Sequence, residues 1–185
     1  MIYYKVTYRK ICCGSSLPNF AYMLYNQAME TRKLNIGCGN HILPEWVNLD
    51  ISALPGVDVV CNIEKLPLPF PDDSFDEVLC QDILEHVDYV PVLQDIHRIM
   101  KKGGSLTIRV PHFTSKFNAV DPTHKKTFSI NTFDFFVKNS FAQHDRGYYF
   151  DFAFSSCQSA QIIFENEPKV FILIGVLFFL INPLL

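Results

Sequence analysis

Short apolar runs that end at glycine or at polar residues recur through the middle of the chain. The first run, 33–36, places Leu34 and Ile36 on one face of a candidate strand that leads directly into Gly37-Cys38-Gly39. Similar runs predict further strands at 46–50, 57–61, 75–80 and 105–110. The run 57–61 is almost entirely apolar, as expected for a parallel strand that is buried on both faces.

One helix is predicted between the last two strands. Pro91 suits its first turn, and Gly103-Gly104 is a typical stop signal. The apolar side chains that recur at helical spacing are Val92, Leu93, Ile96, Ile99 and Met100. Between the first two strands, Pro44 leaves room for at most about one helical turn. Short strands that alternate with a helix or with loops predict an α/β fold with a mainly parallel sheet.

The chain divides into three predicted segments, which are an N-terminal extension at 1–31, a domain at 32–166 and an apolar tail at 167–185. Two interpretations of the extension stay open. Either 20–29 forms an amphipathic helix over an edge of the sheet, or Met29 is the true first residue. The extension shows neither the continuous apolar region nor the small-residue cleavage site of a signal peptide.

The tail contains an uninterrupted apolar run at 170–181. A helix over 170–185 would reach about 24 Å, which is short of the ~30 Å hydrocarbon core of a bilayer. We therefore expect the tail either to pack as a buried element or to make peripheral contact with a membrane. We expect the protein to be located in the cytoplasm. The alternative is a cytoplasmic protein that associates with a membrane through 170–185.

Composition narrows the classes of function. The 185 residues carry a formal net charge of −3, so the chain lacks the basic character of a nucleic-acid-binding protein. The six cysteines include no Cys-x-x-Cys pair, and we predict reduced thiols without disulfides or a metal site. Nucleic acid is not expected as a partner.

Polar residues at the predicted strand ends indicate a ligand site. The turn Gly37-Cys38-Gly39 lets the backbone approach a ligand closely, and Asp50 is placed to accept hydrogen bonds from ribose hydroxyls. A dinucleotide site continues to a third glycine and a long helix, which Pro44 prevents here. The pattern disfavours NAD and favours a nucleoside without phosphates, such as S-adenosylmethionine. Asn62 either offers its amide to an adenine edge, with Ile63 against the ring, or caps a turn.

Several motifs occur in a fixed order between residues 33 and 112. They are Leu34-Asn35-Ile36-Gly37-Cys38-Gly39, Asn48-Leu49-Asp50, Leu66-Pro67, Ser74-Phe75-Asp76, Leu84-Glu85-His86-Val87 and Lys102-Gly103-Gly104. In this order the chain resembles the class I S-adenosylmethionine-dependent methyltransferases, and more narrowly the small type 11 methyltransferase domains. The resemblance implies a Rossmann-like, mainly parallel sheet of seven strands whose last strand is antiparallel. It also implies S-adenosylmethionine as the cofactor and methyl transfer as the activity.

The resemblance assigns cofactor-binding roles at the strand ends. The implied residues are Gly37, Cys38, Gly39, Asp50, Ile51, Asn62, Ile63 and Gln81. The chain departs from the family at Asn62, where an aspartate is common. It also departs at the closing strand, because nothing suitable follows the candidate sixth strand at 160–164. Either 170–181 supplies that strand, or the sheet is truncated.

Methyl transfer from a sulfonium is an in-line displacement, so a base is needed only when the acceptor carries a proton. His112 follows the fifth strand and His124 lies in a loop expected to cover the cofactor, so both are candidate bases. The alternative is that His112 caps the strand end and His124 bonds Asp121 within a structural loop. We expect His86 to pack or cap, and His97 to lie on a solvated helix face.

The sequence predicts an enzyme that transfers a methyl group from S-adenosylmethionine to a small-molecule, glycan or lipid-linked acceptor. Aromatic residues between 113 and 154 are candidate contacts for that acceptor. Two alternatives stay open. One is a non-catalytic binding module with the same fold, and the other is a membrane-associated protein with a truncated sheet.

Overall fold

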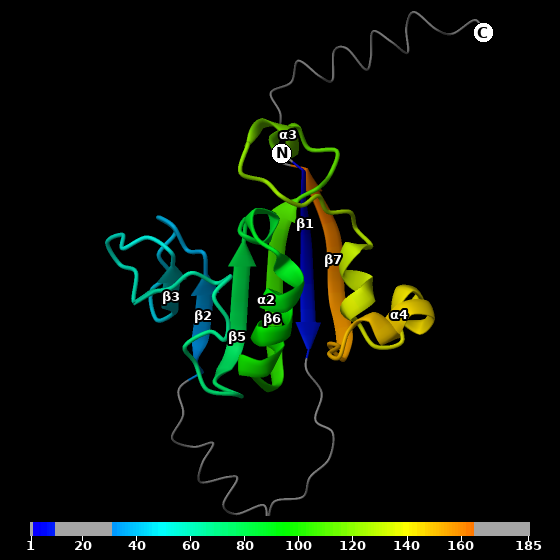
Figure 1. Cartoon of the computed structure of the whole chain (residues 1–185), viewed down its shortest axis with the longest axis horizontal. Coiled ribbons are helices and arrows are strands. Elements are labelled where there is room, and N and C mark those ends of the chain that lie inside the picture. Colours follow the sequence, from blue (N-terminus) through cyan, green and yellow to red (C-terminus); the bar gives the residue numbers. More distant parts are fainter. Residues whose placement is uncertain (1, 10–30, 165–185) are drawn as a thin grey trace, which may run out of the picture.

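The computed structural model describes residues 2–9 and 31–164. In these residues the strands form one seven-stranded sheet in the order β4-β3-β2-β5-β6-β1-β7 (Figure 1). The strands are β1 (Ile2–Arg9), β2 (Lys33–Ile36), β3 (Val47–Asp50), β4 (Val59–Val60), β5 (Phe75–Gln81), β6 (Met100–Pro111) and β7 (Ser156–Phe164). Each neighbouring pair from β4 to β6 is parallel, which confirms the predicted Rossmann-like, mainly parallel sheet.

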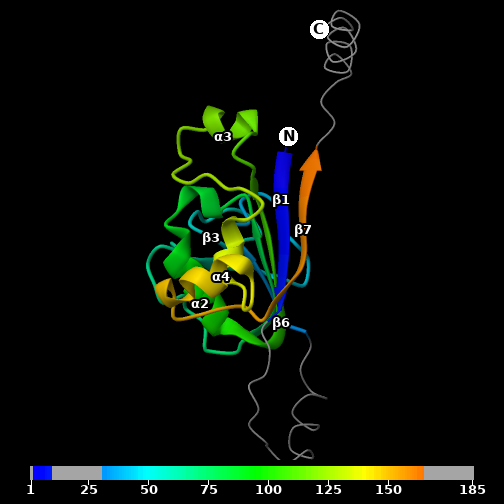
Figure 2. The same cartoon turned by 90° about the vertical axis from the view of Figure 1, so that its right-hand side faces the viewer.

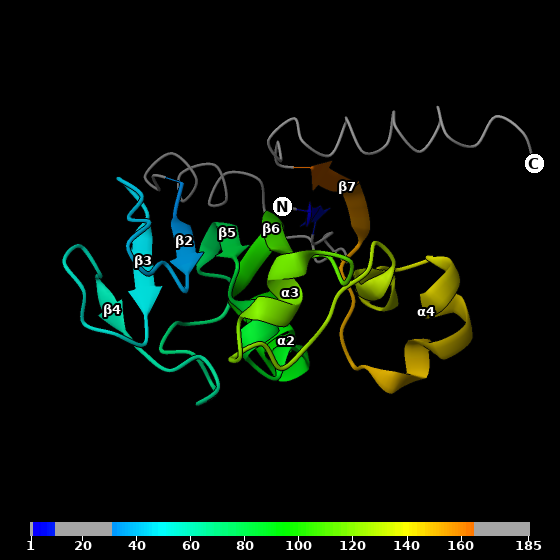
Figure 3. The same ribbon diagram turned by 90° about the horizontal axis from the view of Figure 1, so that it is seen from above.

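The helices of the described residues lie on one side of this sheet (Figures 2 and 3). They are α2 (Tyr89–Ile99), α3 (Lys116–Val120) and α4 (Phe141–Arg146), with 3₁₀ turns η1 (Leu84–His86), η2 (Thr132–Phe136) and η3 (Gly147–Tyr149). The sequence of β6 explains this arrangement, because Leu106 and Ile108 are fully buried whereas Thr107 between them is half-buried. The apolar core therefore fills the space between one sheet face and the helices.

β1 occupies the antiparallel position between β6 and β7. Val6 is paired with Ile108 of β6 and with Ala160 of β7, and both ladders are antiparallel. The closing strand is therefore altered, as predicted, and the seven-stranded sheet of the described residues is not truncated, so that alternative was wrong. The closing strand is supplied by residues near the N-terminal end of the chain, so the sheet extends beyond the predicted domain 32–166. The run 170–181 and the helix expected at 20–29 fall outside the described residues.

Two predicted elements differ in the structure. β4 pairs only with β3 and forms the edge of the sheet, so Val60 is 57% exposed and the expectation of a fully buried strand was wrong. His97 is half-buried rather than solvated, because its ring packs against Phe152 and Phe154. The predicted absence of a long helix after β2 is confirmed, since residues 37–46 form turns.

Candidate functional site

The turn after β2 joins three elements. Gly37 and Cys38 both donate backbone hydrogen bonds to the carbonyl oxygen of Leu49 in β3, at 2.8 and 3.0 Å. Gly37 has a φ of +66°, and a Cβ at this position would lie 2.5 Å from Cγ1 of Ile83. Only glycine fits both the backbone conformation and the close approach of Ile83. The sequence therefore fixes the turn against the strand end and against the segment that leads into η1.

Asp50, at the end of β3, holds the second glycine of the turn. Its Oδ2 accepts a 2.8 Å hydrogen bond from the N–H of Gly39, and its Oδ1 accepts a 2.9 Å bond from the N–H of Ser52. A carboxylate offers about four acceptor positions, so about two remain for a ligand. Asp50 thus combines a structural role with the capacity to bind hydroxyl groups.

A cavity of about 190 Å³, here called the first cavity, opens at this edge of the sheet. The residues that line it are Gly37, Leu49, Asp50, Ile51, Cys61, Asn62, Ile63, Glu64, Ile83, His86 and Val87. Five of the predicted cofactor-binding residues are therefore brought together, namely Gly37, Asp50, Ile51, Asn62 and Ile63. Cys38, Gly39 and Gln81 are not among the lining residues.

The two interpretations of Asn62 prove compatible. Its Oδ1 accepts a 2.9 Å hydrogen bond from the N–H of Glu64, which is the turn-capping role, and its side chain also lines the first cavity. Cys38 is instead buried, at 4% exposure, and burial raises the pKa of its thiol. Cys38 is thus a packed thiol rather than a reactive one.

Sequence reasoning missed the contribution of η1 to the first cavity. Ile83, His86 and Val87 line it, although we expected His86 only to pack or cap. The signal that pointed to them was the motif Leu84-Glu85-His86-Val87, which we used for the resemblance but not for the site.

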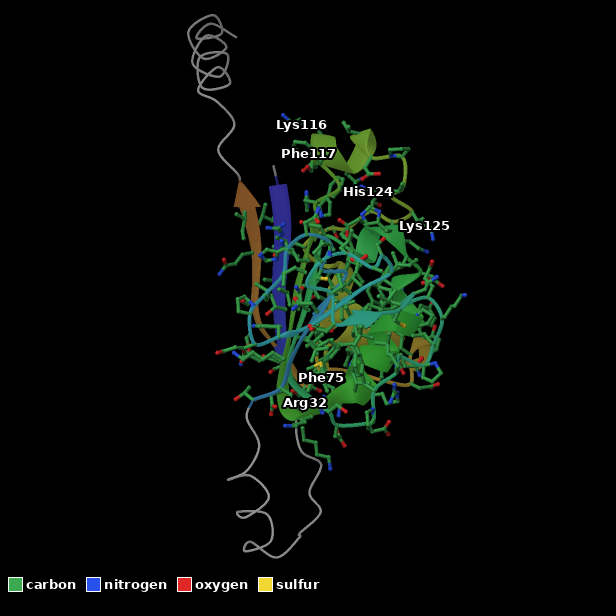
Figure 4. The ribbon with its side chains drawn as sticks, turned by 90° about the vertical axis from the view of Figure 1, so that its left-hand side faces the viewer. Arg32, Phe75, Lys116, Phe117, His124 and Lys125 are labelled. Atoms are coloured by element: carbon green, nitrogen blue, oxygen red, sulfur yellow. The ribbon has the colours of Figure 1, made fainter. Side chains whose placement is uncertain are left out.

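A larger cavity of about 470 Å³, here called the second cavity, lies beyond the ends of β5 and β6. It is lined by Asp82, Glu85, His86, Pro111, Phe117, Val120, Asp121, Pro122 and His124. Figure 4 shows Phe117 and His124 at the end of the molecule that carries α3, opposite Arg32 and Phe75. His86 lines both cavities, so the two spaces meet at one imidazole.

Glu85 is a buried acid beside the second cavity. It is 1% exposed, and its Oε2 has no hydrogen-bond partner among the described residues. Burial, together with the negative charges of Asp82 and Asp121, raises the pKa of Glu85 to about 8. Its backbone carbonyl accepts hydrogen bonds from the N–H groups of Lys125 and Lys126, at 2.7 and 3.2 Å. Glu85 therefore anchors the loop that brings in His124.

The rings of His86 and His124 meet edge to face, with their centroids 4.7 Å apart. His86 Nδ1 lies 2.9 Å from Thr123 Oγ1, and His124 Nε2 lies 3.7 Å from Asp121 Oδ2. Burial and the neighbouring His124 lower the pKa of His86, which favours its neutral form. The contact between His124 and Asp121 agrees with the loop interaction that we considered as an alternative role.

His112 is placed differently. It is 8% exposed, its Nδ1 lies 2.7 Å from Thr114 Oγ1, and its ring contacts that of Phe113. It lines neither cavity. Its contacts match the alternative interpretation, in which His112 stabilises the end of the strand.

Residues 34–108 match the methyltransferase domain family. This segment is a class I S-adenosylmethionine-dependent methyltransferase domain. The match covers β2 to most of β6 and includes every lining residue of the first cavity, whereas His124 and α3 lie beyond it.

Individual relatives cover shorter stretches of the chain. An uncharacterized protein of Methanocaldococcus jannaschii is 40% identical over 84 residues, which is 40% of this chain and 37% of that protein. A demethylmenaquinone methyltransferase of Lysinibacillus sphaericus is 38% identical over 55 residues, or 29% of this chain and 23% of that protein. The matched stretches thus span well under half the length of these relatives.

A solved structure of an S-adenosylmethionine-dependent methyltransferase from Archaeoglobus fulgidus is 28% identical, with a TM-score of 0.48 over 62% of each chain.

As to membranes, none of the helices in the described ranges combines the length and apolar character that a span requires. The predicted membrane contact through 170–185 lies outside those ranges.

Proposed function

We propose that this chain transfers a methyl group from S-adenosylmethionine, bound in the first cavity, to a small-molecule acceptor bound in the second. The observation that carries the proposal is the position of His86, which lines both cavities. A donor in one space and an acceptor in the other would meet beside this imidazole. Such an arrangement provides the proximity on which an in-line displacement depends.

The residues of the first cavity fit the cofactor. Asp50 keeps acceptor positions for ribose hydroxyls, and Asn62 lies at the end of the next strand. Ile51 lines the cavity while 64% exposed, so a planar ring placed there would cover apolar surface that water now contacts. These three residues favour a nucleoside as the ligand.

The bound cofactor supplies an electrophilic methyl group on a sulfonium. The carbon–sulfur bond breaks with its electron pair on sulfur, and a new bond forms to an acceptor oxygen or nitrogen. The proton of that acceptor must leave to a base. His86 and His124 are our candidates because both line the second cavity, and the lowered pKa of His86 keeps its imidazole able to accept a proton.

The lining of the second cavity indicates the chemistry of the acceptor. Phe117, Val120 and Pro122 offer an apolar side, while Asp121 and the two imidazoles offer a polar one. An apolar ring that carries a hydroxyl or amine matches both sides. The relatives named as demethylmenaquinone methyltransferases support a ring-containing small molecule as the acceptor class.

Turnover tests the proposal. The full chain is incubated with S-adenosylmethionine and a panel of phenols, quinols and aromatic amines, and formation of S-adenosylhomocysteine is measured by mass spectrometry. We expect acceptor-dependent product, with kcat reduced about 10²- to 10⁴-fold in His86→Asn. His144→Asn is the matched control, since that side chain is 86% exposed and lines neither cavity. Cofactor binding without product from any acceptor would favour the non-catalytic binding module.

A further inference from the structure

We propose that Glu85, His86 and His124 hold a divalent transition-metal ion of the zinc type in the second cavity. One ligand atom from each of these residues lies within 4.8 Å of the others. The sequence predicted no metal site, because its cysteines lack metal-ligand spacing, and the three residues of this cluster were not considered together. The folded chain brings them together, since the loop that carries His124 is bonded to the carbonyl of Glu85.

Two buried atoms of the cluster lack partners. Glu85 Oε2 and His124 Nδ1 are both inaccessible to water and have no hydrogen bond among the described residues. Glu85 as a whole is 1% exposed. Buried polar atoms are nearly always paired, and each exception calls for a specific reason. A single cation coordinated by both residues would satisfy these atoms at once.

The remaining nitrogen of each imidazole faces a polar group outside the cluster. Thr123 Oγ1 lies 2.9 Å from His86 Nδ1, which directs Nε2 of that ring toward a ligand role. Asp121 Oδ2 lies 3.7 Å from His124 Nε2, which is an ion-pair distance rather than a hydrogen bond, and the unpartnered Nδ1 remains for the ion. Metal-bound histidines commonly use their second nitrogen in this way, and a carboxylate there orients the ring.

The type of ion follows from the ligands. Two imidazoles and one carboxylate form the ligand set of several catalytic zinc sites and of non-haem Fe(II) sites, in which further positions stay open for a substrate. Ligand bonds of about 2.0–2.1 Å place tetrahedral ligands about 3.4 Å apart, so the cluster must contract by about 1.5 Å on binding. Asp121 adds negative charge to a lining that includes neither lysine nor arginine among the described residues, whereas the charge of Asp82 is paired with Arg109. The cavity is therefore suited to a cation.

This inference rests on the proposed function and refines it. An ion at this position would bind an acceptor oxygen and make its hydroxyl more acidic, so that the proton leaves to solvent water. The two imidazoles would then act as ligands instead of bases. The acceptor class narrows to oxygen nucleophiles, because an apolar ring on the Phe117 side would present its hydroxyl to the ion.

Metal titration tests the site without any cofactor. The full chain is stripped with a chelator, and ZnCl₂ alone is then titrated by calorimetry. We expect one high-affinity zinc site. In His124→Asn the affinity for zinc should fall at least about 100-fold. A loss of that size reaches or exceeds the largest one expected when a residue that only orients a metal ligand is replaced. His144→Asn replaces an exposed histidine, so it should bind zinc with the same affinity as the unmodified chain. Equal affinity in all three proteins would overturn the proposal.

A second readout covers the case in which His124→Asn fails to fold. CoCl₂ titrated into the unmodified chain should give visible d–d bands without a thiolate charge-transfer band, because the ligands are nitrogen and oxygen. A thiolate band, or tighter binding of MgCl₂ than of ZnCl₂, would overturn the proposal. Separate binding of S-adenosylhomocysteine by the metal-free chain distinguishes failure of this site from failure of the proposed methyl transfer.

Discussion

The carboxylate of Asp50 accepts a 2.8 Å hydrogen bond from the backbone N–H of Gly39. This contact joins the end of β3 to the turn after β2, so the two parts of the proposed nucleoside site are positioned together. The second oxygen of Asp50 holds Ser52 in the same way. The geometry of the turn therefore depends on the acid that we propose to bind the ribose.

Replacing Asp50 should weaken cofactor binding. Asp50→Ala removes charge-assisted hydrogen bonds worth ~1.5 to 3 kcal/mol, which corresponds to about 10- to 150-fold in the affinity for S-adenosylhomocysteine. Asp50→Asn keeps the shape of the side chain and one acceptor oxygen, so its affinity for S-adenosylhomocysteine should fall by less. Calorimetric titration of the three proteins measures the effect. Unchanged affinity in Asp50→Ala would contradict the ribose assignment.

Gly37→Ala should destabilise the fold more than Gly39→Ala. Both glycines have positive φ, at +66° and +48°, and alanine there costs on the order of 1–2 kcal/mol. Only at Gly37 does the new Cβ also collide with Ile83, at 2.5 Å from Cγ1, whereas nothing lies within 4 Å at Gly39. Urea unfolding compares the two variants. Equal midpoints would show that contact with Ile83 does not constrain the turn.

Glu85 should make the metal-free protein less stable as pH rises. Its pKa is about 8 in the folded state against 4.5 for the ordinary side chain, so the folded state binds more protons between these values. Stability from this group is complete below about pH 4.5 and is lost as pH rises through 8, by an amount on the order of 2–5 kcal/mol.

Glu85→Gln cannot ionise, so it should lose less stability over that range. Thermal unfolding from pH 5 to 9, with a chelator present, compares it with the unmodified chain. Parallel stability curves for the two proteins would show that Glu85 ionises normally in the fold.

Val6→Pro should disrupt the sheet. Val6 lies between Ile108 of β6 and Ala160 of β7, and proline in a central strand removes a ladder hydrogen bond, so the urea midpoint should fall. Val6→Thr keeps the N–H group and the branched side chain, and it serves as the control. Circular dichroism during urea unfolding measures both. A proline variant as stable as the threonine variant would contradict the central position of β1.

Most of the parallel half of the sheet was predictable from local pattern. An apolar run that ends at glycine or at a polar residue marks each of the strands β2, β3, β5 and β6. Because these strands were expected to be parallel, the position of the ligand site at their carboxyl ends could also be inferred. β4 was misjudged because periodicity does not show whether a strand has one neighbour or two.

The remaining features depend on contacts between distant residues. β1 is separated by a long segment from both of its partners, and no local pattern specifies that an N-terminal strand fills the closing antiparallel position. His86 belongs to η1 and His124 to a loop distant in sequence, and their proximity depends on hydrogen bonds from Lys125 and Lys126 to the carbonyl of Glu85. His112 was favoured by its position in sequence, yet its contact with Thr114 and Phe113 places it outside both cavities.

The most direct test of the account is calorimetric titration of the full chain with S-adenosylhomocysteine, alongside the same titration with NAD. The first cavity adjoins a turn without a helix to hold a pyrophosphate, so we predict one site for S-adenosylhomocysteine in the micromolar range and no binding of NAD. Absence of S-adenosylhomocysteine binding by the folded chain, or tighter binding of NAD, would contradict the proposed methyl transfer.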